Sequence, residues 1–236
     1  MKKKYFSVIF LALICFVGLL SSEQSVKVMK NIFSTGAKGE EGKQIVVAID
    51  AGHGGRDPGK VGVNDALEKD INLSIAYKLK SLLEQNDIKV VMTREDDSGL
   101  YSATDRNRKS ADLNKRVEII QSSGALIAVS IHQNSFTEEY VMGAQVFYHT
   151  NSLEGKQLAE IIQEQLKITI ADGNHRKAKS NDNYYMLKKT VCPLVIVECG
   201  YLTNNKESAL LLEEGYQEKM AWGIHLGIMR FINENQ

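Results

Sequence analysis

The sequence lacks three features that would each point to a class of function. It carries no net charge, because 29 lysine and arginine residues balance 29 aspartate and glutamate residues, so no global field draws it to nucleic acid. It has no internal repeat of the length that builds solenoids. Its three cysteines do not form the pattern of a disulfide framework. What is there is a chain of 236 residues, 43% of them hydrophobic, which is enough for one sizeable core and an appendage.

The cysteines are expected to remain free thiols. Cys15 lies in an apolar run and lacks the small preceding residue that a lipoprotein signal needs. Cys192 and Cys199 flank a strand-like segment, and strand residues at that separation are too far apart to bridge without a tight turn. We therefore expect two buried thiols rather than a disulfide.

The appendage is an apolar run, residues 5–20, which follows three lysines at positions 2–4. At about 16 residues it is short for a membrane span and fits the apolar region of a signal peptide. Residues 1–22 are thus predicted to be a signal peptide or an uncleaved N-terminal membrane anchor, and Leu20 is too poor a cleavage-site match to decide between them. In both cases the chain is exported, contacts membrane only through this segment, and lies at the outer face of the cytoplasmic membrane.

Residues 23–43 mix polar residues with glycine and predict a flexible linker. From residue 44 to residue 236, short apolar runs alternate with helical patterns. Strands are predicted at residues 44–50, 88–93, 126–132, 144–148, 184–187 and 193–198. Helices are predicted after Leu67, before Gly124, and around residues 158–166 and 216–231. This order predicts an α/β fold, a three-layer sandwich with a largely parallel central sheet of about six strands and helices on both faces.

Ionisable residues stand where three of these strands end. His53 follows the first strand, His132 ends the third and Glu198 ends the last. Because ligands of parallel sheets bind beyond the carboxyl ends of the strands, these side chains are expected to gather at one edge. Glu68 opens the helix after the His53 loop and can turn back toward that edge.

Two imidazoles and a carboxylate are a typical zinc ligand set that leaves a fourth position for water, and a second carboxylate suits a general base. Spacing alone supports this weakly, because the His-Glu-x-x-His pattern of helix-borne zinc peptidases is absent, and a single strand-end histidine is more often structural. Glu198 favours a function, since a carboxylate after an apolar run is costly to bury unless it is paired or binds metal. The other histidines are expected to be structural or on the surface: His149, His175 and His225.

Five segments resemble those of a known family. They are IDAGHGGRDPGKVG (residues 49–62), LEKDINLSIAYKLKSLLE (67–84), VVMTREDD (90–97), DLNKRVEIIQSSGALIAVSIHQNS (112–135) and PLVIVECGYLTNNKESALL (193–211). In this order they resemble the zinc-dependent N-acetylmuramoyl-L-alanine amidases, which hydrolyse bacterial peptidoglycan. The resemblance extends from about Gln44 to Phe231, nearly all of the predicted globular part.

The resemblance implies a role for each of the four residues. His53, Glu68 and His132 match the family's ligands for one Zn²⁺ ion, and Glu198 matches its catalytic glutamate. The implied reaction is hydrolysis of the amide between the lactyl group of N-acetylmuramic acid and L-alanine, with peptidoglycan of the wall or cortex as the partner.

Within the family, the chain is most similar to the sporulation-specific amidases that prepare spore cortex for germination. It shares their N-terminal anchor, a catalytic domain without wall-binding repeats, the insertion at residues 99–117 and the basic loop at residues 175–180. In a sporulating cell this implies a location between the mother-cell and forespore membranes. Ile120-Gln121 stands where the family often has Ala-Asn, a difference that we assign to helix packing.

Other polar residues have two readings each. Asn134, Arg94, Arg116 and Arg176 are candidate substrate-binding residues, and each is also explained by a structural role. Asp50 is expected either to cap the turn or to accept a hydrogen bond from a ligand imidazole.

Other classes of function stay open from the sequence. One is a wall-binding module that has lost its activity, against which the presence of all four residues argues. Another is a hydrolase that binds metal weakly and needs an activating exported or lipoprotein partner. A third is a zinc peptidase or deacetylase on a related sheet, which only the substrate would distinguish.

Overall fold

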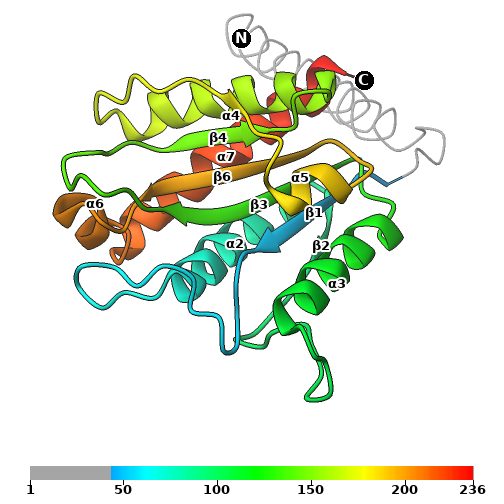
Figure 1. Cartoon of the computed structure of the whole chain (residues 1–236). Coiled ribbons are helices and arrows are strands. Elements are labelled where there is room, and N and C mark those ends of the chain that lie inside the picture. The colour runs from blue at the N-terminus through cyan, green and yellow to red at the C-terminus, as the bar shows by residue number, and fades with distance from the viewer. Residues whose placement is uncertain (1–43, 236) are drawn as a thin grey trace, which may run out of the picture. The chain divides into compact units, whose positions relative to one another are not determined.

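The structure is a computed structural model that describes residues 44–235 (Figure 1). The predicted signal peptide or anchor (1–22) and linker (23–43) lie outside the described residues, so the domain boundaries remain predictions. Within residues 44–235, no helix has both the length and the apolar character needed to cross a membrane.

The described strands form one sheet in the order β2-β1-β3-β6-β4-β5. The strands β2, β1, β3 and β6 are parallel, β4 is antiparallel to β6, and β5 is parallel to β4. β1, β3 and β6 are buried almost throughout, which explains why they appear in the sequence as continuous apolar runs. Their bounds are β1 Val46–Ala51, β2 Lys89–Met92, β3 Ile127–Asn134, β4 Gln145–Tyr148, β5 Lys179–Ser180 and β6 Leu194–Tyr201.

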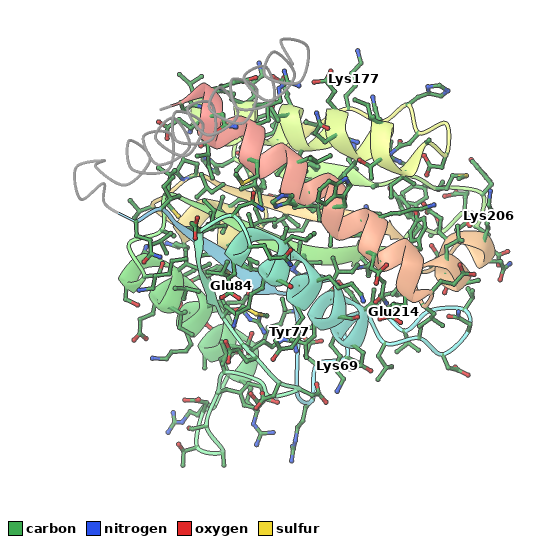
Figure 2. The ribbon with its side chains drawn as sticks, turned by 180° about the vertical axis from the view of Figure 1, so that it is seen from behind. Lys69, Tyr77, Glu84, Lys177, Lys206 and Glu214 are labelled. Atoms are coloured by element: carbon green, nitrogen blue, oxygen red, sulfur yellow. The ribbon has the colours of Figure 1, made fainter. Side chains whose placement is uncertain are left out.

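Helices cover both faces of the sheet, which confirms the predicted three-layer α/β sandwich. One face packs against α2 (Glu68–Glu84), α4 (Leu153–Ile170) and α7 (Glu214–Glu234), which lie side by side in Figure 2 with Lys69 and Glu84 near the two ends of α2. The other face packs against α3 (Arg108–Ser122) and α5 (Tyr185–Lys189) (Figure 1). The short helix α6 (Asn205–Leu210) follows β6.

The helix starts differ in a way that bears on the site. Asn107 caps α3 by accepting a hydrogen bond from the Ser110 N–H at 3.0 Å, as its residue type predicts. The start of α2 has no such side-chain cap, although its first turn carries Glu68 and Asp70. Acidic side chains are favoured at a helix N-terminus, and Glu68 there is directed back toward the end of β1 rather than used as a cap.

One predicted strand is wrong. The segment 184–187 lies largely in α5, where Met186 and Leu187 are buried against α3 and the sheet. Periodicity does not distinguish a strand from a helical turn in so short an apolar run. The sixth strand is instead the two-residue β5, whose exposed polar side chains give no apolar signal.

Cys192 and Cys199 are free thiols, as expected. Cys199 is fully buried, whereas Cys192 is only partly so. Burial nevertheless raises the pKa of the Cys192 thiol to about 11, so it stays protonated and unreactive at neutral pH.

Candidate metal and catalytic centre

A strained turn carries His53 away from the end of β1. His53 has a φ of 64°, and Gly54 and Gly55 follow with φ of 136° and 60°. Glycine adopts such angles freely, whereas a histidine there is strained by about 1–2 kcal/mol. Gly52 is required for a different reason, because there is no room for a side chain: a Cβ at this position would lie 2.2 Å from Cε1 of His132. The turn therefore passes directly against the second imidazole.

Replacing Gly52 by alanine is expected to weaken metal binding about 10- to 100-fold, because the new methyl group displaces the His132 ring. Titration of the metal-free protein with zinc measures the effect. Gly215→Ala is the matched control, since a Cβ on this glycine of α7 meets nothing within 4 Å. Unchanged affinity in Gly52→Ala would show that the ring has room to move.

His53, Glu68 and His132 come together at the carboxyl ends of β1 and β3. One ligand atom from each residue lies within 4.8 Å of the other two. Oε1 of Glu68 is 3.2 Å from Nε2 of His53 and 3.0 Å from Nδ1 of His132. Two imidazoles and a carboxylate this close are a donor set suited to zinc. The sequence prediction that these side chains converge is confirmed.

Neighbouring groups fix the orientation of these side chains. Asp57 accepts a hydrogen bond from Nδ1 of His53 at 2.9 Å, the arrangement that orients imidazole ligands in metal sites. The backbone N–H groups of Gln133 and Lys60 donate to the two oxygens of Glu68, at 3.0 Å and 2.7 Å. The cluster is thus held in place before any ligand enters.

The charges in the cluster favour an added cation. Burial alone would raise the pKa of Glu68, but the hydrogen bonds and charges of His132 and His53 outweigh it and lower the pKa. Burial likewise opposes the charge on His53, yet Glu68 and Asp57 raise its pKa to about 9. Buried Glu68 therefore needs positive charge beside it, and a divalent metal ion supplies that charge while leaving the imidazoles neutral.

Glu198 lies beside this cluster, because β3 and β6 pair with His132 opposite Glu198. Its side chain is buried, and burial raises its pKa. Oε1 accepts a hydrogen bond from the Tyr184 hydroxyl at 3.2 Å, whereas Oε2 has no partner among the described residues. A buried carboxylate with one unpaired oxygen is rare in a purely structural role, and it suits a proton acceptor.

Tyr184, which precedes α5, is a residue of the site that the sequence does not predict. Its ring packs edge-on against Phe147, with centroids 5.7 Å apart, and this contact holds the hydroxyl over Glu198. The sequence predicts a strand over residues 184–187, and nothing in its spacing connects Tyr184 to Glu198. Only the contact between separate elements reveals it.

Two buried arginines hold the backbone of the turn. Arg94 donates to the carbonyls of Ala51 at 2.8 Å and Gly52 at 3.1 Å. Arg116 donates to the carbonyls of Ala51 at 2.7 Å and His53 at 2.5 Å. Both guanidinium groups donate hydrogen bonds to the protein's own backbone. Substrate binding by either arginine therefore stays a prediction that the structure does not support.

Neither sequence reading of Asp50 is correct. Its carboxylate accepts hydrogen bonds from Thr93, Ser130 and Arg116, at 2.5 to 2.7 Å, and from no turn N–H or imidazole within residues 44–235. Burial would raise its pKa, but the charge of Arg116 and the hydrogen bonds from Ser130 and Thr93 hold the pKa at about 2. Asp50 is therefore the buried anchor of Arg116.

The other predicted residues lie at different distances from the centre. Asn134 ends β3 and lines a cavity beside the metal cluster. Arg176 does not line that cavity: it donates to the Met142 carbonyl at 2.7 Å and lies over the Tyr201 ring. The remaining described histidines stay outside the cluster, as expected: His149, His175 and His225.

Two adjoining cavities meet at the cluster. The first, of about 390 Å³, lies between the β1 turn and α3. The second, of about 500 Å³, lies between α3, α5 and the ends of β3 and β6 and contains Glu198. Five residues border both: His53, Lys109, Leu113, His132 and Met186. A long substrate can therefore cross the centre with a part on each side.

Comparisons with known proteins agree with this geometry. A family profile described as N-acetylmuramoyl-L-alanine amidase matches residues 47–230. The germination-specific N-acetylmuramoyl-L-alanine amidase of Bacillus subtilis is 35% identical over 192 residues, 80% of each chain.

Solved structures match as well. The CwlD amidase of Clostridioides difficile, solved in complex with the GerS lipoprotein, is 43% identical, with a TM-score of 0.78 over 81% of this chain and all of the other. The catalytic domain of the amidase CwlV from Paenibacillus polymyxa is 32% identical, with a TM-score of 0.71 over 80% of this chain and 99% of the other.

Proposed function

The chain belongs to the N-acetylmuramoyl-L-alanine amidase family, and on that premise we propose that it hydrolyses peptidoglycan with one zinc ion bound by His53, Glu68 and His132. The bond cut is the amide between the lactyl group of N-acetylmuramic acid and L-alanine. The observation that carries the proposal is Glu198, a buried carboxylate with an unpaired oxygen beside the three-ligand cluster.

The residues divide the work of the reaction. Zinc bound there would polarise the scissile carbonyl and lower the pKa of a bound water toward about 7. Oε2 of Glu198 takes the proton of the attacking water and returns it to the leaving amine. The Tyr184 hydroxyl holds Oε1, so that Oε2 faces the reacting atoms. Glu68, already charged, keeps both imidazoles in place.

We extend the proposal to the setting of the reaction. The similarity to a germination-specific amidase of Bacillus subtilis supports a role in spore cortex maturation. The apolar segment at residues 5–20 supports export to the outer face of the cytoplasmic membrane, which in a sporulating cell is the space between the two membranes.

An activating partner is part of the same proposal. A relative was solved in complex with a lipoprotein, and we propose that an exported or lipoprotein partner promotes activity of this chain. The test is the zinc content of the chain purified alone and with the partner. If the chain retains zinc only when the partner is present, the partner promotes activity by strengthening zinc binding.

Digestion of defined peptidoglycan tests the activity. We expect one zinc ion per chain by elemental analysis, and mass spectrometry should find free stem peptides beside intact glycan strands. Removal of zinc by a chelator should stop the release, and added zinc should restore it. Cut sugars or cut cross-links would contradict the assigned bond, and a metal-free, inactive protein would favour a wall-binding module.

A further inference from the structure

The first cavity beside the centre is lined by unpaired positive charge. Arg56 lies on the β1 turn, and Arg108 and Lys109 lie in the first turn of α3. None of these three side chains forms a hydrogen bond or an ion pair with any residue in the described range 44–235. Cations that face a cavity without an acidic partner are available to an anionic ligand.

The acidic groups of the same cavity are already engaged. Asp57 is bonded to His53 at 2.9 Å, and Asp112 is paired with Arg116 at 2.5 Å. Asp50 is buried beneath and pairs with Arg116 as well. These carboxylates thus have partners of their own, so the cavity presents net positive charge to a ligand.

The wall that carries Arg108 is tightly packed. Its guanidinium lies over the Tyr101 ring, 5.7 Å from the centroid. The Tyr101 hydroxyl accepts a hydrogen bond from the Arg56 N–H at 3.1 Å. A Cβ on Gly99 would come within 2.1 Å of that ring. The segment between β2 and α3 is therefore packed against the β1 turn, which keeps Arg108 at the cavity.

The placement of these cations is unfavourable for the helix alone. The first turn of α3 carries Arg108 and Lys109 and no acidic residue. Cations at a helix N-terminus oppose the helix dipole, so nothing in helix stability explains them. Their charge adds to that of the dipole and increases the attraction for an anion in the cavity.

The second cavity has a different character. Apart from Lys109 at its border and the groups of the catalytic centre, its polar lining is neutral. The neutral polar residues are Gln133, Asn134, Ser135, Asn183, Tyr184 and Tyr185. Amide and hydroxyl groups with aromatic rings suit an uncharged sugar, not a carboxylate.

We propose that the first cavity is the stem-peptide subsite, in which Arg108 and Lys109 pair with peptide carboxylates, and that the glycan lies in the second. This inference rests on the proposed function, because the amide to be cut joins a sugar chain on one side to a peptide on the other. The peptide continues from L-alanine to glutamate, whose free carboxylate is the nearest anion to the cut. Amidation of that carboxylate removes the charge that the subsite recognises.

Two matched substrates test the subsite: muramoyl peptides whose glutamate carboxylate is free or amidated. For the wild-type full chain we expect kcat/KM to be about tenfold higher on the free acid, mainly through KM, and the preference to shrink with added salt. The double variant Arg108→Gln and Lys109→Met should cleave both substrates alike. Lys115→Met is the control, because Lys115 lies on the same helix but pairs with Glu118 at the surface.

A binding experiment makes the result independent of turnover. Calorimetry with L-alanyl-D-glutamate should detect binding to the wild type and a loss of affinity of about tenfold in the double variant. Equal cleavage of the two substrates by the wild type, or an unchanged preference in the double variant, overturns the subsite. Dipeptide binding without release of stem peptide from either substrate would instead contradict the proposed function and leave the subsite supported.

Discussion

Replacing Glu198 by glutamine is expected to lower the release of stem peptide about 10³-fold, while the protein stays folded and binds zinc. Glutamine has the shape of glutamate but accepts no proton, so the attacking water loses its base. The metal ligands are untouched by the change. The measurement is the rate of stem-peptide release, with zinc content determined on the same sample. Retained turnover would overturn the role assigned to Glu198.

The stability of this variant has a characteristic pH dependence. Burial raises the pKa of Glu198, so the folded protein holds the proton more tightly than the unfolded chain does. The wild type is therefore progressively destabilised as the pH rises above about 4.3, the ordinary value for glutamate. In metal-free protein, Glu198→Gln should be the more stable form at pH 7, and the difference should vanish below pH 4 or so.

Glu207 provides a matched control for Glu198. It is also buried, but both of its oxygens accept hydrogen bonds from backbone N–H groups, those of Gly143 and Tyr201, at 2.9 Å each. Glu207→Gln places an amide donor against one of those N–H groups and should lower the free energy of unfolding by about 1–3 kcal/mol. Its activity per folded molecule should be unchanged. The two variants thus separate loss of chemistry from loss of stability.

Replacing Arg116 by methionine is expected to lower the free energy of unfolding by about 3–5 kcal/mol. Asp50 is 1% exposed and would be left as a buried charge without its cation. The His53 carbonyl would lose its side-chain donor and the Ala51 carbonyl would keep only Arg94, so zinc affinity should fall together with stability. Denaturant unfolding and zinc titration measure the two effects. Lys115→Met, which removes an exposed cation from the same helix, should change stability by less than about 0.5 kcal/mol.

A second substitution separates the destabilisation caused by the unpaired charge of Asp50 from that caused by the lost packing of the Arg116 side chain. In Asp50→Asn with Arg116→Met the buried charge is gone, so part of the lost stability should return. Because the folded pKa of Asp50 is held at about 2, its contribution is present above pH 4 and is lost as the pH falls toward 2. The free energy of unfolding of Asp50→Asn should therefore change less with pH in that range than that of the wild type. If the changes in the free energy of unfolding caused by Asp50→Asn and Arg116→Met simply added in the double variant, the Asp50–Arg116 ion pair would not be the source of the stability lost in Arg116→Met.

The sequence predicted the parts of the site that follow from periodicity and chain order. β1, β3 and β6 are long apolar runs, so the positions of His53, His132 and Glu198 at their ends could be inferred once a parallel sheet was assumed. The position of Glu68 needed one further inference, that the helix after the His53 loop begins at the same edge of the sheet. The roles of these four residues in catalysis rest on the family resemblance and on the experiments above.

Features that depend on side-chain contacts between distant elements could not be inferred. Tyr184 reaches Glu198 only because α5 packs beneath β6, and Arg94 and Arg116 bond to main-chain atoms that carry no sequence signal. The strand β5 is two polar residues long and is defined only by its partner β4. Spacing along the chain contains none of this information.

The arginines that hold the β1 turn make the centre depend on chain that comes much later. Arg94 lies 43 residues beyond Ala51, and Arg116 lies 63 residues beyond His53. Contacts between residues so far apart form late in folding, because the intervening loops must close first. The hydrogen bonds that hold the turn around His53 can therefore form only when β2 and α3 have docked. A chain that is still extended therefore lacks the assembled metal cluster, and hydrolysis has to wait until these later segments are in place.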